Sequence, residues 1–355
     1  MFKKITINKI IVLALLLLVL LGATFFINNK KNSQYVAGND ITISDDTINI
    51  LEEKTKWTER IKEVGANVAF VEFKNKFSTM RYDQQHSIAH LFGEILYKSE
   101  GIKGLVICDD TFGFGCFHGF FSAALDDRGP KVLKDLDKVC VDKYGVGGSG
   151  CQHGLGHGLL EYYGHDYKGL VKSLNECDKT TFYIKKFGCT SGVFMEYDIP
   201  ISLTVKNLNL NSRELDPKNP YYPCTDVSDR FKESCYFSLG QWWKSLNNSD
   251  YAASGRMCSK IDDVVNRESC YLGIGYVVAP SFQNDVNKSV NACKKISNKE
   301  GEMLCVAGVE WQIYANPDTR KNTKSACGTL PTELYKQCLL KADLVGSHGQ
   351  IFDNL

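Results

Sequence analysis

The sequence predicts an all-α protein: an α-solenoid of about eight disulfide-stapled helical hairpins behind an N-terminal transmembrane helix. Two observations carry this prediction. Fourteen cysteines form a regular series between residues 108 and 338, and an uncharged apolar run occupies residues 10–27. A fixed period of about 20–50 residues is typical of stacked repeat units, and disulfides persist outside the cytosol.

The N-terminus predicts a membrane anchor. Residues 1–9 carry three lysines and form a cytoplasmic n-region, and the following 18 apolar residues are just long enough to span a bilayer, which needs about 17–25. A cleaved signal peptide is the alternative, although residues 21–24 (LGAT) make a poor cleavage site. We therefore expect a single-pass protein of the cell membrane, with a linker at 28–46 and an extracytoplasmic helical-repeat domain at 47–355.

The charge of the exported part argues against nucleic acid as a partner. Residues 32–355 contain 37 basic and 41 acidic residues, a formal charge of −4. Nucleic-acid binding calls for a basic patch or stripe. Apart from the membrane at the N-terminal helix, the expected partners are an envelope protein, a peptide or a glycan.

The cysteines form seven local pairs. Within a pair the separation is 8 residues and then 11 or 12, and successive second cysteines follow at steps of 35, 38, 46, 35, 35 and 33. Each predicted disulfide closes a short loop, worth about 3 kcal/mol in the chain-entropy model. The predicted pairs are Cys108 and Cys116, Cys140 and Cys151, Cys177 and Cys189, Cys224 and Cys235, Cys258 and Cys270, Cys293 and Cys305, Cys327 and Cys338.

The residues around each pair predict a helix A, a turn and a helix B. Apolar residues follow the second cysteine at helical spacing, as at Ile274 and Val277 after Cys270. The first cysteine is expected near the end of helix A and the second about one turn into helix B. A glycine often stands three residues after the second cysteine, although glycine inside a helix costs about 1 kcal/mol. Its recurrence predicts that a neighbouring helix approaches there, as in a solenoid. The longest step predicts an inserted loop near residues 198–222.

One segment carries a family resemblance. The sequence CDDTFGFGCFHG at 108–119 resembles the disulfide-bridged helical-hairpin repeats, related to tetratricopeptide repeats, of cysteine-rich secreted bacterial proteins. The resemblance implies a right-handed solenoid in an exported protein. It implies no functional residue.

Five of the seven histidines share one phase of the repeat. Aligning Gln84 with the second cysteines reveals a first unit without a disulfide, and counting from these positions places histidine at offsets 2 and 6 and glutamate at offset 10. At about 100° per residue these side chains point away from helix A, toward the surface that solenoids use for binding. They are His86, His90 and Glu94 in the first unit, His118 in the second, and His153, His157 and Glu161 in the third.

This pattern predicts a metal site. Two histidines four residues apart on a helix can bind one ion, and a carboxylate one turn further on can be a third ligand or orient one. Helices pack about 8–10 Å apart, so His118 can complete a site with either pair. Imidazole and carboxylate favour zinc, then copper, nickel or iron. His165 and His348 fall outside this phase and are expected at the surface.

Three functional interpretations remain open. The preferred one is a binding or scaffold protein with a metal site on its first three repeats. The second is a metal-dependent hydrolase of envelope material, in which Glu94 or Glu161 acts as a general base on metal-bound water. The third is a purely structural envelope protein, whose histidines only pack and hydrogen-bond between units; Phe237, Leu272 and Trp311 at the same offsets of later repeats favour packing there.

Overall fold

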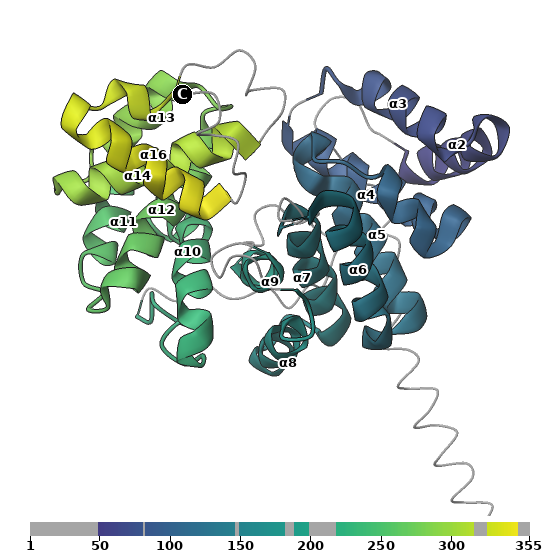
Figure 1. Ribbon diagram of the computed structural model, residues 1–355, viewed down its shortest axis with the longest axis horizontal. Coiled ribbons are helices and arrows are strands. Elements are labelled where there is room, and N and C mark those ends of the chain that lie inside the picture. The colour runs from purple at the N-terminus through teal and green to yellow at the C-terminus, as the bar shows by residue number, and fades with distance from the viewer. Residues whose placement is uncertain are drawn as a thin grey trace, which may run out of the picture. The chain divides into compact units, whose positions relative to one another are not determined.

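The computed structural model describes residues 49–80, 82–145, 149–181, 188–198, 218–315 and 325–346. All of them belong to one compact unit, residues 41–355. As the sequence predicts, this described part is all-α, with fourteen α-helices and short 3₁₀ turns (Figure 1). The predicted membrane anchor at 10–27 and the linker at 28–46 lie outside the described residues. Within the described ranges, no helix has both the length and the apolar character needed to cross a bilayer.

Eight described helices occupy the predicted positions of the second helix of each unit, and we term them the B helices. They are α4 (Tyr82–Glu100), α5 (Gly115–Arg128), α7 (Ser149–Tyr163), α9 (Cys189–Asp198), α10 (Asp229–Leu246), α12 (Val264–Ser281), α14 (Lys299–Ala315) and α16 (Thr332–Gly346). The other α-helices are α2 (Ile50–Val64), α3 (Ala66–Phe77), α6 (Leu133–Tyr144), α8 (Tyr167–Cys177), α11 (Tyr251–Cys258) and α13 (Val286–Cys293). The 3₁₀ turns are η1 (Gly101–Ile107), η2 (Thr111–Phe114), η3 (Pro130–Val132) and η6 (Cys327–Thr329).

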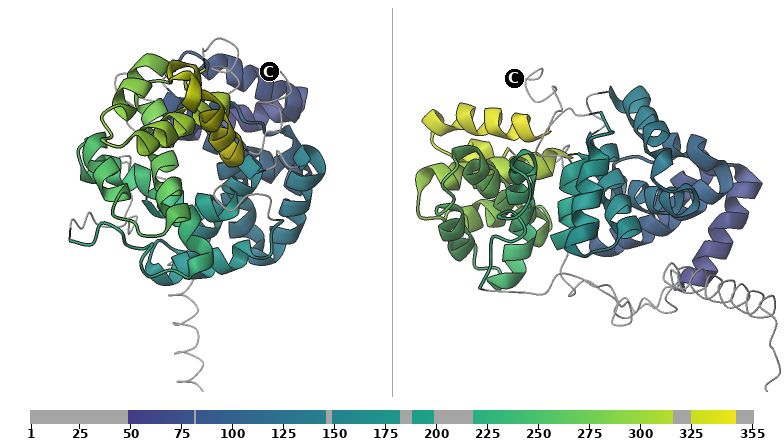
Figure 2. Two further views of the ribbon diagram at one scale, coloured as in Figure 1. Left: turned by 60° about the vertical axis from the view of Figure 1, so that its left-hand side comes forward. Right: turned by 90° about the horizontal axis from the view of Figure 1, so that it is seen from below.

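The B helices pack against one another in chain order. Each contacts the next, from α4 on α5 to α14 on α16 (Figures 1 and 2). The helices α6, α8, α11 and α13 each pack on the B helix that follows them. This order places the same turn of successive B helices side by side, so residues at one offset of the repeat become neighbours.

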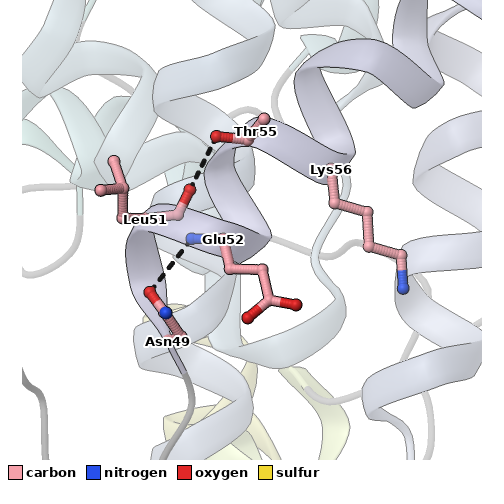
Figure 3. Close-up of a pocket in the computed structure, with 5 residues that line it drawn as sticks. All are labelled: Asn49, Leu51, Glu52, Thr55 and Lys56. Carbon is pink, nitrogen blue, oxygen red and sulfur yellow. Dashed lines mark hydrogen bonds between the residues drawn. The ribbon is translucent and has the colours of Figure 1, made fainter.

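Short polar residues start several of these helices. Asp166, Asp250, Asp263 and Asp285 each stand at an N-cap, where a carboxylate oxygen accepts a hydrogen bond from the backbone N–H three residues on. Asn49 does the same at the start of α2, at 3.1 Å from Glu52 N (Figure 3). Such a cap contributes about 1 kcal/mol, because it satisfies an N–H group that the helix itself leaves unpaired.

All seven predicted disulfides are confirmed. Each joins the two cysteines of one repeat, with Cα–Cα distances of 5.5–5.7 Å. No cysteine is free, and all fourteen are buried in the hydrophobic core. Seven disulfides in one chain indicate an extracytoplasmic, oxidising location.

The helix boundaries differ from the prediction in the first repeats. In α10, α12, α14 and α16 the second cysteine lies in the second turn, as predicted. In α5, α7 and α9 the helix begins at the cysteine or within two residues before it. At α5 the reason is visible, because the chain before it makes a left-handed turn with positive φ at Phe112 (53°), Gly113 (62°) and Phe114 (66°).

The predicted close approach at the repeated glycines is confirmed. A β-carbon placed on Gly119 would lie 1.8 Å from the carbonyl oxygen of His90 on the preceding B helix. The corresponding distance from Gly192 to the His153 oxygen is 1.9 Å, and from Gly273 to the Phe237 oxygen it is also 1.9 Å. No side chain fits into these gaps, so glycine is required for the B helices to touch.

The contact between α5 and α7 is built differently. A β-carbon on Gly154, the third residue after Cys151, would meet the ring of Phe121 and the Cβ of Phe117 rather than a backbone carbonyl. These two phenylalanines are buried and stand between the helices.

Candidate metal centre

The five histidines of the shared phase converge at the contacts of three B helices. His86 and His90 come from α4, His118 from α5, and His153 and His157 from α7. The ring centroid of His118 is 5.0 Å from that of His86, 5.1 Å from that of His90 and 4.0 Å from that of His157. The alignment that placed them on one face of successive helices therefore holds. The expectation that this face is a binding surface does not hold for His118, His153 and His157, which are buried. Metal binding itself remains a prediction.

The nitrogens form two groups that share one residue. His86, His90 and His118 make the first group, and His118, His153 and His157 make the second. In each group, one nitrogen per residue lies within 4.8 Å of the others. Ligands of a tetrahedral ion lie about 3.3 Å apart when the metal–nitrogen bond is about 2.05 Å. Small rotations of the side chains would close the remaining gap.

The α7 pair has its outer nitrogens fixed by hydrogen bonds. His157 Nδ1 lies 2.8 Å from Glu196 Oε2, and an ionised carboxylate only accepts, so this nitrogen carries the proton. His153 Nδ1 lies 2.8 Å from Ser191 Oγ. The hydroxyl donates to Gly188 O at 2.9 Å, so it accepts from His153. Such outer-shell partners are typical of metal-binding histidines.

When both rings are neutral, the inner nitrogens of this pair have no proton between them. His153 Nε2 and His157 Nε2 lie 3.0 Å apart. With both Nδ1 atoms protonated, each neutral ring points a lone pair at the other. Two lone pairs at this separation repel, and a cation between them removes the repulsion. The cation is either a metal ion or a shared proton.

The α4 pair is oriented by the left-handed turn before α5. His86 Nδ1 donates to the carbonyl oxygen of Phe112 at 3.0 Å, and Phe112 itself has φ 53°. A bulky residue at positive φ costs about 1–2 kcal/mol, and such strain is concentrated at functional sites. The Nε2 atoms of His86 and His90 lie 3.1 Å apart.

His118 occupies the centre of the cluster without hydrogen bonds. Its side chain is 96 % buried (4 % exposed), and neither Nδ1 nor Nε2 has a hydrogen-bond partner in the described part of the chain. A buried polar group left unsatisfied costs about 1–3 kcal/mol. Its ring stacks on that of His157, with 26° between the planes.

Burial favours the neutral form of four of the five imidazoles. Burial lowers the pKa of His86 below its usual value and lowers the pKa of His90, His118 and His153 well below it. His153 and His157 are fully buried, whereas His86 and His90 remain partly exposed. The cluster therefore has a buried end at α7 and a partly open end at α4. Neutral imidazole is the form that binds metal.

Glu196 on α9 contacts the cluster, although the sequence pattern does not predict it. One carboxylate oxygen accepts from His157 and the other lies 3.0 Å from His165 Nε2. Burial acts to raise the pKa of Glu196, but the hydrogen bonds from His157 and His165 outweigh it and lower the pKa. The expectation of an exposed His165 is wrong, since its side chain is 11 % exposed and held by this carboxylate. His348 lies outside the described residues.

The two predicted carboxylates have other partners. Glu94 forms ion pairs with Lys54, at 2.7 Å, and with Lys98. Glu161 accepts a hydrogen bond from Ser122 on α5. The two groups of potential ligand atoms around His118 contain histidines alone. A ligand or general-base role for Glu94 and Glu161 thus remains a prediction, as do the hydrolase and purely structural interpretations.

The protein surface also contains a hollow at the start of α2. Asn49, Leu51, Glu52, Thr55 and Lys56 line it (Figure 3). Its hydrogen bonds serve the helix, with Asn49 accepting from Glu52 N and Thr55 Oγ1 donating to Leu51 O at 2.9 Å. This hollow does not contain any of the predicted metal ligands.

Comparison with models of protein families, with curated proteins and with solved structures finds no match. The structure shows a helical protein with seven disulfide-bridged helix pairs. The closer resemblance to tetratricopeptide-related repeats remains a prediction.

Proposed function

We propose that this protein is an extracytoplasmic, membrane-anchored α-solenoid of eight helical units that binds a divalent transition metal, zinc first, in its five-histidine cluster. The observation that carries the proposal is the pair of Nε2 atoms on α7, 3.0 Å apart with their ring protons committed to Ser191 and Glu196. An all-nitrogen ligand set at this spacing suits zinc, copper or nickel.

A metal ion here would tie the first three units together. The ligands come from α4, α5 and α7, which the chain orders through hydrogen bonds and packing alone in the metal-free protein. An ion that binds only the folded state stabilises it, by about 2.7 kcal/mol when the free ion is at 100 times its dissociation constant. The proposed role is therefore a metal-dependent scaffold in the cell envelope.

Metal content after purification without an affinity tag tests this proposal. We expect at least one zinc, copper or nickel ion per chain by elemental mass spectrometry. The double variant His153→Ala/His157→Ala should lose it, because two ligands and the outer-shell contacts of both are removed, while far-UV circular dichroism stays largely unchanged.

A histidine outside the repeat phase gives the matched control. His348→Ala removes one imidazole from the chain and should keep the metal. Wild-type protein that carries no ion, and whose melting temperature does not move when zinc, copper or nickel is added, would contradict the proposal and favour the shared proton.

A further inference from the structure

We infer that the cluster holds two metal ions that share the ring of His118, one bound with His86 and His90 and the other with His153 and His157. This inference rests on the proposed function and goes beyond it, because a single ion on any three of these histidines would satisfy that proposal. The ligand class is a pair of divalent ions that favour imidazole, such as copper(II) and zinc(II).

His118 lies between the two pairs of histidines. It lies on α5, which packs on α4 on one side and on α7 on the other. It is the single member common to both groups of nitrogens in the described part of the chain. Each imidazole nitrogen has one lone pair, so one ring can bind two ions only through its two different nitrogens. Both of these atoms are buried and lack hydrogen-bond partners in the described residues.

The histidine pairs on α4 and α7 are each spaced to bind one ion. The Nε2 atoms are 3.1 Å apart in the α4 pair and 3.0 Å apart in the α7 pair. With metal–nitrogen bonds of about 2.0–2.1 Å, either separation corresponds to an angle of about 95–100° at one ion. Each pair therefore matches the bite of its own ion. The five nitrogens do not form a single group within 4.8 Å among the described residues, so one ion does not reach both pairs.

The bridge forms by loss of one proton. The first ion takes the lone pair of one His118 nitrogen, while the other nitrogen keeps its hydrogen. When the second ion binds, that N–H bond breaks, a metal–nitrogen bond forms and the proton leaves to solvent. The ring becomes an imidazolate with one negative charge, and neither ion changes its oxidation state. Each ion then has three protein ligands and an open fourth position for water or an anion, as zinc has in catalytic sites.

The two positions are unequal. The two histidines of the α7 position are buried, and His157 donates a hydrogen bond to the carboxylate of Glu196 at 2.8 Å. The α4 position has partly exposed ligands, and a backbone carbonyl rather than a carboxylate holds His86. An anionic outer-shell partner makes a histidine a stronger donor. The ion at the α7 position should therefore bind first and exchange more slowly than the ion at the α4 position.

Copper(II) titration of the full-length, metal-stripped protein tests the bridge. We expect two ions per chain by calorimetry and elemental analysis. At two equivalents, electron paramagnetic resonance should show much less signal than two isolated ions give, because an imidazolate couples their spins. This measurement on the wild type needs no variant that has to fold.

Variants then assign the positions. His86→Ala/His90→Ala and His153→Ala/His157→Ala should each leave one uncoupled ion, and His118→Ala should abolish the coupling. Two uncoupled ions in the wild type would overturn the shared ring. One ion per chain would overturn the two-ion site and leave the proposed function standing. No bound copper, zinc or nickel would overturn both.

Discussion

The B helices α4, α5 and α7 and the later helices α10, α12 and α14 occupy equivalent positions in the repeat, but the first three carry polar side chains at these positions and the other three each carry an aromatic ring. At offsets 2 and 6, α4, α5 and α7 carry the histidine cluster. At the same offsets the later helices carry Phe237, Tyr276 and Trp311, whose ring centroids lie 5.5, 6.0 and 4.7 Å from one another. Aromatic rings satisfy one another by packing, whereas buried imidazoles need partners for their nitrogens. The same place in the repeat is thus a core in one half and a candidate site in the other.

The backbone does not explain this difference. Gly192 approaches the carbonyl of His153 as closely as Gly273 approaches that of Phe237, with 1.9 Å from the position of a β-carbon in both cases. The repeat therefore fixes where the side chains meet, and the identity of the side chains determines whether that position is a hydrophobic core or a candidate metal site.

The largest expected effect of a single substitution comes from the aromatic half. Phe237→Ala should lower the free energy of unfolding by about 3–5 kcal/mol, because it removes a ring that is 2 % exposed and leaves a cavity beside Tyr276 and Trp311. His153→Ala at the same offset should cost the metal-free protein less, about 1–2 kcal/mol, since it removes mainly one hydrogen bond. Chemical denaturation with the disulfides intact measures both. Equal losses would contradict the contrast between core and site.

The glycine contacts should respond alike in both halves. Gly192→Ala and Gly273→Ala each place a methyl group against a carbonyl oxygen and should cost about 1–3 kcal/mol by forcing the helices apart. Gly328→Ala is the matched control, because the nearest described atom to a β-carbon there would be Ser325 Cβ at 3.7 Å, an ordinary contact. Gly192→Ala should also weaken metal binding, since it displaces His153. A metal affinity unchanged by Gly192→Ala but reduced by Gly273→Ala would reverse the assignment of the two halves.

The sequence allowed the disulfides and the histidine cluster to be predicted, because both depend on repeat spacing. The cysteines from Cys108 to Cys338 recur at a regular period along the chain, and the phase of His86, His118 and His153 follows from the same period. Glu196 could not be found in this way. It stands seven residues after Cys189 rather than at the glutamate offset of ten, and it reaches His157 from the neighbouring helix. Periodicity within a helix does not show which turn of the next helix faces it.

The sequence separation of one repeat is the one signal that points to Glu196 as a partner of His157. His157 and Glu196 are 39 residues apart and His153 and Ser191 are 38 apart, close to one repeat. The serine was visible as the next member of the offset-2 series, which makes the neighbouring unit the place to look for partners. The error at His165 has the same origin, because this residue lies outside the phase and is partly buried beside Glu196, with Nε2 3.0 Å from Oε1.

Acid should destabilise the metal-free protein through the histidine half. The folded-state pKa values of His86, His90, His118 and His153 are lowered by burial, whereas the unfolded chain titrates near 6.5. Below about pH 6.5 the unfolded state therefore binds protons that the folded state does not. The free energy of unfolding should fall as the pH drops, by up to about 1.4 kcal/mol per pH unit for each histidine. Denaturant unfolding between pH 7.5 and 5 in the presence of a chelator measures this slope.

The controls separate the cluster from the other histidines. His348→Ala should leave the slope near the wild-type value, and replacement of a cluster histidine by phenylalanine should reduce it. A stability that is constant across this range would show that the cluster already holds its protons in the folded state, as the shared-proton alternative requires.

The smallest effect, and the one that tests the comparison most directly, is His118→Phe. This change places in α5 the kind of ring that Phe237 provides in α10, and it removes two buried nitrogens without partners among the described residues. We expect the metal-free protein to gain about 1 kcal/mol, because the desolvation cost of the unsatisfied imidazole disappears while the larger ring takes back part of the gain. Added zinc should stabilise the wild type and leave this variant nearly unaffected. The variant should therefore have the higher melting temperature without zinc, and the wild type the higher one with zinc. A variant that is less stable than wild type in chelator would mean that His118 contributes to the metal-free fold, and the cluster would then be a polar core rather than a site kept open for ions.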